Sequence, residues 1–319
     1  MMDWTDRHCR YFLRLISRRA RLYTEMVTAP ALLHGDVPRH LDFDPAEHPL
    51  ALQLGGSDPA MLAHGARLGE RWGYDEINLN CGCPSERVQT GSFGACLMNE
   101  PELVADCVRA MRDAVALPIT VKHRIGLNDH EDYGFVRDFV GTVAAAGCEV
   151  FIVHARNAVL KGLSPKENRE VPPLRYKTVH RLKREFPSLN IVINGGLMSW
   201  PDVDRELESV DGIMIGRAAY HDPYLLAAAD ARLFDSEMPA PSRAEVVLSL
   251  VPYADAQLAR GTPLRAIARH VLGLYHGRPD GRRFRQMLSD ATRLKDNDTS
   301  LFVEALAAVE GNQTVSLVD

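Results

Sequence analysis

The sequence predicts an α/β protein: a parallel (β/α)8 or TIM barrel, followed by a small domain built only of helices. The chain has 319 residues, and one such barrel takes roughly 200 to 250. Short apolar or β-branched segments alternate with segments of helical pattern, an order typical of parallel β/α architecture. After residue 234 a proline-bearing linker leads into helical patterns alone. We therefore expect a catalytic barrel domain over 1–234 and a helical domain over 235–319.

Seven strands are expected, each a short apolar run bounded by turn residues. They cover 22–27, 50–54, 76–80, 119–123, 150–154, 191–194 and 212–215. Prolines mark the starts of several intervening helices, at Pro59, Pro101 and Pro201. Proline is well tolerated in the first turn of a helix, so these positions support the predicted alternation.

Charge and cysteine content limit the classes of function. The net charge of -5 argues mildly against nucleic-acid binding, but the stretch 260–295 is locally basic, which indicates either a phosphate-binding surface or a solvated helical face. No apolar run approaches the roughly 20 residues of a membrane span, and the first residues do not resemble a signal peptide. Six cysteines without a spacing framework favour reduced thiols, with Cys9, Cys107 and Cys148 in the core. We expect a cytoplasmic protein, a monomer without a stable protein partner.

Polar residues follow the expected strands, where a parallel barrel places its chemistry. They include Gln53, Asn80, Lys122, Arg124, His154 and Asn194. Any one of them taken singly could be a satisfied buried polar group, but their regular recurrence indicates a functional edge.

Two glycine-bearing turns follow the last two strands. Asn194-Gly195-Gly196 and Gly216-Arg217 lie where barrels commonly bind phosphate with backbone N–H groups. The alternative is a pair of ordinary strand-to-helix turns.

A cysteine follows the third expected strand. Pro84 ends the strand and presents Cys83 on a turn, where its thiol could act as a nucleophile, an acid or a metal ligand. A metal site formed by Cys81, Cys83 and Cys96 is disfavoured, because no second Cys/His pair with ligand spacing follows. No metal is expected.

The same region resembles the signature of the tRNA-dihydrouridine synthases, and it is most similar to their A subfamily. The signature is carried here by Cys83-Pro84, Val88 and the run from Gly91 to Ala95. The resemblance extends over nearly the whole chain, through the segments DWTDRHCRYFLRLISR, ALQLGGSDP, LSPKENREVPPL, INGG and GRAAYHDP. Together these motifs are specific, whereas a single glycine pair would not be.

The resemblance implies an FMN-dependent enzyme that reduces uridine to 5,6-dihydrouridine in the D-loop of tRNA, at positions 20 and 20a. FMN would pass hydride to C6 of uracil while the catalytic Cys83 protonates C5, and NADPH would reduce the flavin again. A free thiol is mostly protonated at neutral pH, which suits this role as an acid.

The resemblance also implies ligand contacts. For FMN these are Met1, Met2, Gln53, Lys122, His154, Asn194, Gly195, Gly196, Gly216 and Arg217. For tRNA they are Asn80 at the uracil edge, Lys166 and Arg169 in a polar loop, and Arg282 and Arg285 in the helical domain.

One barrel strand is missing from the expected set of eight. In the family the first strand leads into the segment that begins this chain, so we expect it to belong before Met1. Our hypothesis is that the start was assigned too late or the chain was trimmed.

Two other functions compete. One is an FMN barrel oxidoreductase that acts on a small molecule such as a dihydroorotate or a dihydropyrimidine; the basic helical domain argues against it. The other is a tRNA-binding protein that has lost catalysis.

Overall fold

The computed structural model describes residues 1–85 and 91–311. By their contacts they fall into two compact units. One comprises Tyr23–Phe43 and Leu50–Gly216, and the other comprises Met1–Leu22, Asp44–Pro49 and the residues from Arg217 onward. The predicted boundary between residues 234 and 235 lies inside the second unit and stays a prediction.

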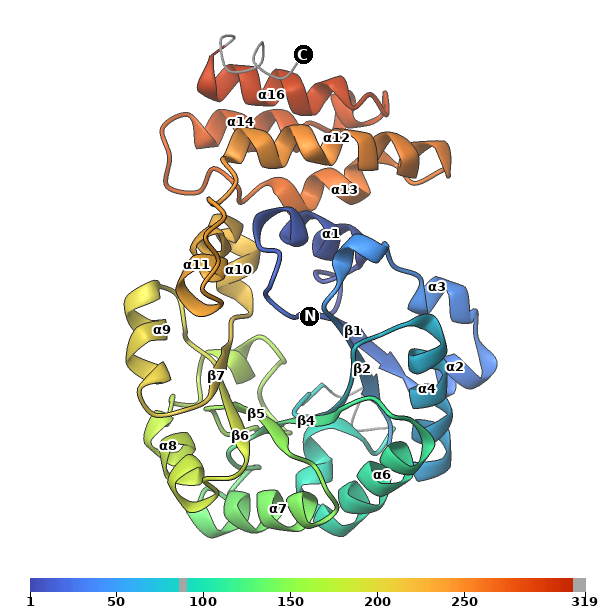
Figure 1. Ribbon diagram of the computed structural model, residues 1–319, viewed down its shortest axis with the longest axis vertical. Helices are drawn as coiled ribbons and strands as arrows, with labels where there is room; N and C mark the ends of the chain where they lie inside the picture. Colours follow the sequence, from blue (N-terminus) through green and yellow to red (C-terminus); the bar gives the residue numbers. More distant parts are fainter. Residues whose placement is uncertain (86–90, 312–319) are drawn as a thin grey trace. The chain divides into compact units, whose positions relative to one another are not determined.

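All seven predicted strands are present in one sheet in the order β1 to β7, and β2 to β7 pair in parallel. Figure 1 shows them curling around a centre, with α4, α6, α7, α8 and α9 on the outer side. This arrangement is a TIM-barrel architecture. The strands are β1 (Leu22–Thr28), β2 (Leu50–Gly55), β3 (Glu76–Cys81), β4 (Ile119–Arg124), β5 (Val150–His154), β6 (Asn190–Asn194) and β7 (Gly212–Met214).

The helices of this unit connect or follow the strands. They are α2 (Ala29–His34), α3 (Val37–Leu41), α4 (Pro59–Trp72), α6 (Pro101–Ala114), α7 (Tyr133–Ala145), α8 (Tyr176–Glu185) and α9 (Trp200–Leu207), with 3-10 turns η2 (Gly94–Asn99) and η3 (Glu167–Arg169).

Helix α4 shows how the sequence sets the packing of helix on sheet. Gly65 and Gly69 are four residues apart and therefore lie on one helix face. A Cβ at Gly69 would lie 2.5 Å from Ile77 Cδ1 and 2.9 Å from Leu52 Cδ2. The two glycines thus allow α4 to approach the sheet closely, and larger side chains there would push the helix away.

The other unit is helical over its described residues from 217 to 311, which confirms the predicted all-helical segment after residue 234. Its helices are α1 (Arg7–Ile16), α10 (Arg217–His221), α11 (Ala229–Leu233), α12 (Arg243–Ala259), α13 (Leu264–Val271), α14 (Gly281–Leu288), α15 (Ala291–Leu294) and α16 (Ser300–Glu310), with η1 (Pro45–Glu47) and η4 (Pro223–Ala228).

Ionic contacts fix α1 within this unit. Asp6 caps α1 by accepting from the His8 and Cys9 N–H groups, and its carboxylate also contacts Arg269 at 2.7 Å and His270 at 3.0 Å on α13. These partners hold the pKa of Asp6 well below its usual range although burial opposes the shift. The cap and the ion pairs therefore attach α1 to α13.

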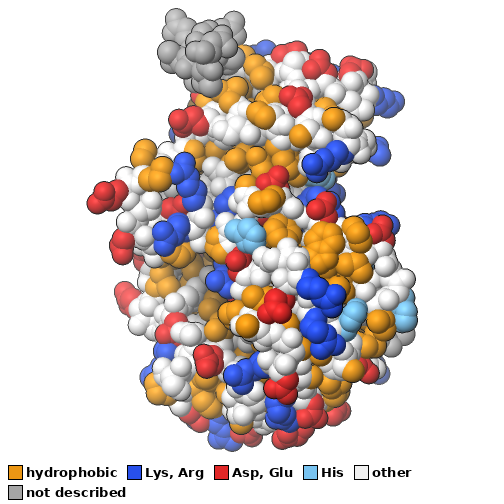
Figure 2. Space-filling model, turned by 45° about the vertical axis from the view of Figure 1, so that its right-hand side comes forward, with side chains coloured by type: hydrophobic (Ala, Val, Ile, Leu, Met, Phe, Trp, Pro, Cys, Tyr) orange, Lys and Arg blue, Asp and Glu red, His pale blue; other side chains and the backbone are white. Residues whose placement is uncertain are grey.

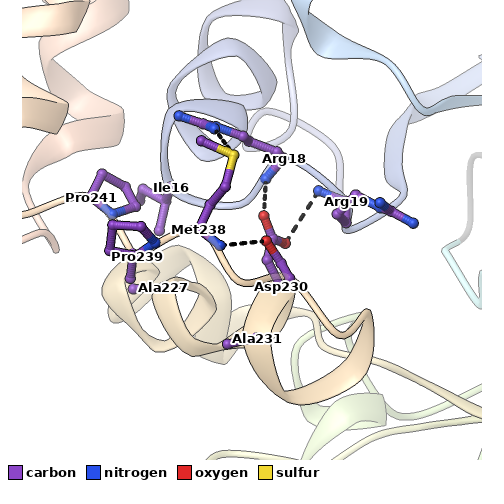
Figure 3. Close-up of a pocket in the computed structure, with 11 residues that line it drawn as sticks. Ile16, Arg18, Arg19, Ala227, Asp230, Ala231, Met238, Pro239 and Pro241 are labelled. Carbon is purple, nitrogen blue, oxygen red and sulfur yellow. Dashed lines mark hydrogen bonds between the residues drawn. The ribbon is translucent and has the colours of Figure 1, made fainter.

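A small pocket also lies in this unit. Figure 3 shows the Asp230 carboxylate directed at Arg18 and Arg19, whose backbone N–H groups donate to it at 2.7 and 3.2 Å. The residues that line this pocket include none of the predicted site residues. The carboxylate is already engaged in holding the turn after α1, so the pocket does not mark the active site.

His123 on β4 is a buried histidine in an apolar environment. Its Nδ1 donates to the Arg124 carbonyl at 2.6 Å, its Nε2 has no hydrogen-bond partner among the described residues, and its ring packs near Phe139 and Phe151. Burial lowers its pKa to about 4 from 6.5. Between about pH 4 and pH 6.5, His123 is therefore mostly neutral in the folded protein, whereas in the unfolded chain it binds a proton.

This depressed pKa predicts acid sensitivity. The contribution of neutral His123 to the free energy of unfolding is fully present above about pH 6.5 and is lost as the pH falls toward 4. At pH 4.5 the loss is about 2–3 kcal/mol. His123→Leu should remove this part of the loss. Urea unfolding of wild type and variant at pH 7 and pH 4.5 measures it.

His40→Leu, at an exposed position of α3, is the matched control and should leave the pH difference as in wild type. An equal loss of stability in wild type and His123→Leu would contradict the assignment.

Candidate active site

The strand register brings the predicted polar residues into one row. Asn80 on β3 lies opposite Lys122 on β4, Arg124 lies opposite His154 on β5, and His154 lies opposite Asn194 on β6. Asn194 then donates through Nδ2 to the Met214 carbonyl on β7 at 2.8 Å. Because the strands are parallel, the row follows the carboxyl edge of the sheet, where barrel enzymes place their reacting groups.

Cys83 sits on a turn that Asn80 holds in place. The Asn80 Oδ1 accepts from the Gly82 N–H at 3.0 Å and from the Cys83 N–H at 2.9 Å, and the Ala95 N–H donates to the Cys83 carbonyl at 2.9 Å. The thiol is half-buried and donates to Ser85 Oγ at 3.5 Å. Val88, the next residue of the sequence motif, lies outside the described residues.

Gln53 is part of the same polar network. Its Nε2 donates to Asn78 Oδ1 and its Oε1 accepts from Asn80 Nδ2, both at 2.8 Å. An amide has two N–H groups and two acceptor sites on oxygen, so one of each remains for a ligand. The prediction that Gln53 contacts a flavin ring is therefore compatible with this geometry and stays a prediction.

Lys122 is a half-buried lysine at the same edge. Its ammonium makes no hydrogen bond or ion pair within the described part of the chain, and burial, with Arg124 nearby, lowers its pKa to about 7. A desolvated cation is stabilised by an anionic or electron-rich ligand. The position of Lys122 is therefore compatible with a bound flavin, and the predicted contact stays a prediction.

The turn after β6 requires glycine. Gly195 has φ +108° and Gly196 has φ +71°, conformations that side chains other than glycine rarely adopt. A Cβ at Gly195 would lie 2.6 Å from His154 Cδ2, and one at Gly196 would lie 2.4 Å from Leu174. Tyr176 donates to the Gly195 carbonyl at 2.7 Å. The backbone is thus held close to His154, and the predicted phosphate-binding role of this turn stays a prediction.

Arg124 joins two loops beneath this edge. The side chain is buried, and it donates to the Gly82 carbonyl at 3.1 Å, the Asn157 carbonyl at 3.3 Å and the Asn168 carbonyl at 2.9 Å. Burial lowers its pKa to about 10, so it stays charged at neutral pH. It ties the cysteine turn to the loop that carries Lys166 and Arg169.

The other predicted contacts have these positions. Lys166 is exposed and Arg169 is half-buried, at η3. Arg282 and Arg285 are exposed on α14, whereas Phe284 between them is buried. The remaining four are Met1 and Met2, which are 37% and 55% exposed, and Gly216 and Arg217, which are half-buried around the start of α10.

Some residues of the network were not predicted. They are Glu76, Asn78 and Thr120, which lie below Gln53 and Asn80, and Ser85 beside the thiol. The spacing of Glu76, Asn78 and Asn80 was the available signal, because residues two apart on a strand share a face. Ser85 lies in a turn, where spacing gives no such signal.

The other cysteines are buried, except for Cys96, which is half-buried. Cys9, Cys107 and Cys148 are buried as predicted, and Cys81 is buried too. Burial raises the pKa of Cys107 and Cys148 to about 12. Within residues 1–85 and 91–311, no three His, Cys, Asp or Glu side chains are grouped to hold a metal ion.

A parallel barrel with a thiol, a lysine of lowered pKa and a glycine turn at its carboxyl edge has the arrangement of an enzyme site. The family model for dihydrouridine synthase (Dus) matches residues 1–310, and the chain belongs to that family. Members of this family are flavin-dependent.

Similar proteins are found in several bacteria. The chain is 57% identical over 311 residues to the tRNA-dihydrouridine(20/20a) synthase of Pseudomonas putida, covering 98% of this chain and 93% of that protein. It is 53% identical over 310 residues to the enzyme of that name from Salmonella typhimurium (97% and 93%), and 54% identical over 308 residues to that of Synechocystis (97% and 92%). Within the described residues, no helix combines the length and apolar character needed to cross a membrane.

Gly195 supplies a direct test of the turn. Gly195→Ala should destabilise the protein by about 1–3 kcal/mol, because it combines backbone strain with the contact to His154. Chemical denaturation at neutral pH measures the loss.

Gly162→Ala is the matched control. Gly162 has φ +85° but open space around its Cβ position, so this variant reports backbone strain alone. Equal losses in the two variants would show that the approach of His154 contributes nothing.

Proposed function

We propose that this protein reduces uridine to 5,6-dihydrouridine in the D-loop of tRNA, at positions 20 and 20a. The observation that carries the proposal is Cys83, whose thiol stands on a fixed turn at the carboxyl edge of the sheet, with Asn80 and Lys122 side by side in the adjoining strands. Family membership supports the reaction class, and the names of the similar proteins support the substrate.

FMN is the flavin that we propose. The residues that would hold it are Gln53, Lys122 and His154 for the ring, and the Asn194–Gly196 turn with Gly216 and Arg217 for the phosphate; Met1 and Met2 are further proposed contacts. When bound, FMN supplies the hydride for C6 of the uracil ring. Lys122 would balance negative charge on its ligand; its lowered pKa, and the lack of a partner among residues 1–85 and 91–311, favour this role.

Cys83 would deliver the proton. In this proposal the thiol gives its proton to C5 of uracil, and Ser85 Oγ, at 3.5 Å from the sulfur, orients the S–H bond between turnovers. Asn80 has a double role. Its oxygen holds the Cys83 turn and one N–H contacts Gln53, so its second N–H is available for the uracil edge.

The tRNA has to present an unstacked uridine, which requires a grip on the surrounding phosphates. Lys166 and Arg169 would hold the target nucleotide, and Arg282 and Arg285 on α14 would contact the tRNA backbone. On the face in Figure 2, lysine and arginine side chains are interspersed with acidic ones rather than gathered. Binding would therefore depend on the two local pairs, Lys166 with Arg169 and Arg282 with Arg285. We further propose NADPH as the reductant and a monomer in the cytoplasm.

The reaction is tested by anaerobic reduction of the FMN-reconstituted protein, followed by mixing with tRNA that lacks dihydrouridine. Return of the oxidised flavin spectrum, with dihydrouridine appearing in the tRNA, would support the proposal. A flavin that stays reduced with tRNA but is reoxidised by orotate would favour the small-molecule alternative.

Replacing the proposed acid should slow this step. Cys83→Ala should lower the rate of flavin reoxidation by tRNA about 100-fold or more, because general acid catalysis typically contributes 10²–10⁴-fold. Stopped-flow absorbance measures the rate. Cys96→Ala, at another half-buried thiol, is the control and should react as wild type. Wild-type kinetics in Cys83→Ala would remove Cys83 from catalysis.

The α14 arginines should affect binding rather than chemistry. Arg282→Ala with Arg285→Ala should weaken tRNA binding and reduce the slope of log Kd against log salt by about 1.5, since each lost phosphate contact contributes about 0.7–0.9. Filter binding across a salt series measures it.

A charge-matched control is available on α8. Lys177→Ala with Arg184→Ala also removes two exposed cations. If both pairs change the slope equally, the effect is one of net charge and α14 has no specific part.

A further inference from the structure

A continuous chain of side-chain hydrogen bonds runs through the sheet interior to the Cys83 turn. Its links, from the far end, are Thr120 Oγ1 to Glu76 Oε1 at 2.6 Å, then Asn78 Nδ2 to Thr120, Gln53 Nε2 to Asn78 and Asn80 Nδ2 to Gln53, each at 2.8 Å. It ends where Asn80 Oδ1 accepts the Gly82 and Cys83 N–H groups. The Tyr23 hydroxyl also donates to Glu76 Oε1, at 3.0 Å.

Every hydrogen bond of this chain is donated in the same direction, toward Glu76. The single hydroxyl proton of Thr120 is donated to Glu76 Oε1, so the Thr120 oxygen is left to accept from Asn78. Asn78 must then present its oxygen to Gln53, and Gln53 its oxygen to Asn80. At the other end the Cys83 N–H can only donate, which requires the Asn80 oxygen there.

A reversal at any link would propagate. If Asn78 turned its oxygen to Thr120, its NH2 would face the NH2 of Gln53. Gln53 and then Asn80 would have to turn as well. Asn80 would finally place an NH2 against the Gly82 and Cys83 N–H groups, and the turn would lose its acceptor. The far end of the chain therefore bears on the geometry of the thiol.

We propose that Glu76, Thr120 and Asn78 are positioning residues for Cys83, because they fix the direction of the amide chain that holds its turn. None of the three contacts Cys83 in this chain of links, and their effect passes through Gln53 and Asn80. Glu76 and Asn78 are buried at 4% and 0% exposure, and Thr120 at 1%, so water does not replace a missing partner at low cost. The inference rests on the proposed role of Cys83 as acid.

Thr120 offers the cleanest test, because two substitutions separate shape from hydrogen bonding. Thr120→Val keeps the shape and removes both the donor and the acceptor, whereas Thr120→Ser keeps the hydroxyl. Two quantities are measured in the full-length FMN-bound protein. One is the rate of Cys83 alkylation by iodoacetamide, followed by peptide mass spectrometry with half-buried Cys96 as internal reference. The other is the single-turnover rate with tRNA as a function of tRNA concentration.

Thr120→Val should change the alkylation rate of Cys83 relative to Cys96 about threefold or more. It should also lower the maximal single-turnover rate about tenfold with little change in the tRNA concentration at half-maximal rate, since misplacement of a reacting group affects the chemical step. Thr120→Ser should stay within about twofold of wild type in both quantities. If Thr120→Val does not fold, Glu76→Gln, of nearly the same shape, replaces it with the same expectations.

An unchanged alkylation rate of Cys83 in the folded Thr120→Val or Glu76→Gln variant would overturn the inference. So would equal effects of Thr120→Ser and Thr120→Val. Cys83→Ala separates this failure from that of the proposed function: if it reacts with tRNA as wild type does, the acid role is wrong, and the alkylation rates alone decide whether the chain positions the thiol.

Discussion

Polar side chains buried among packed strands have to hydrogen-bond to one another, because little water reaches them. In this protein that requirement is met on β2, β3 and β4 by amides and hydroxyls that are matched donor to acceptor from Glu76 to Asn80. Apolar residues at the alternate positions of the same strands, such as Ile77 and Leu79, are buried on the opposite face. One strand thus serves the hydrophobic core with one face and the active site with the other.

Several cations lie near one another at the carboxyl edge of the sheet. Arg124 is surrounded by backbone carbonyls, and the charges of Arg169 and Arg156 act on it. Lys122 stands in the same region with its pKa lowered to about 7. Burying such charges is unfavourable for the protein alone. A bound anion would therefore offset part of the free-energy cost of burying these charges.

The strands and the location of the site were predictable from sequence, but the pairing within the site was not. Apolar runs and prolines placed the strand ends within about one residue of those observed, since both signals are local. The hydrogen-bond partners of Asn80 could not be predicted from the sequence. Its oxygen serves the Cys83 turn and its nitrogen serves Gln53, and these partners depend on the register between β2, β3 and β4. Arg124 was likewise visible as a strand-end cation, but its carbonyl acceptors lie up to 44 positions away in the chain. The role of Val88 lies beyond the described residues.

The three carbonyls around Arg124 belong to different segments: Gly82 to the cysteine turn, and Asn157 and Asn168 to the loop after β5. Asn168 is itself buried. Its side-chain oxygen accepts from the Val159 N–H, and its side-chain nitrogen donates to the Val159 carbonyl. If either segment moved away, the guanidinium would remain buried with too few acceptors. The two segments are consequently expected to move as one body, and in the function proposed above a nucleotide held by Lys166 would meet a cysteine turn that is already in place.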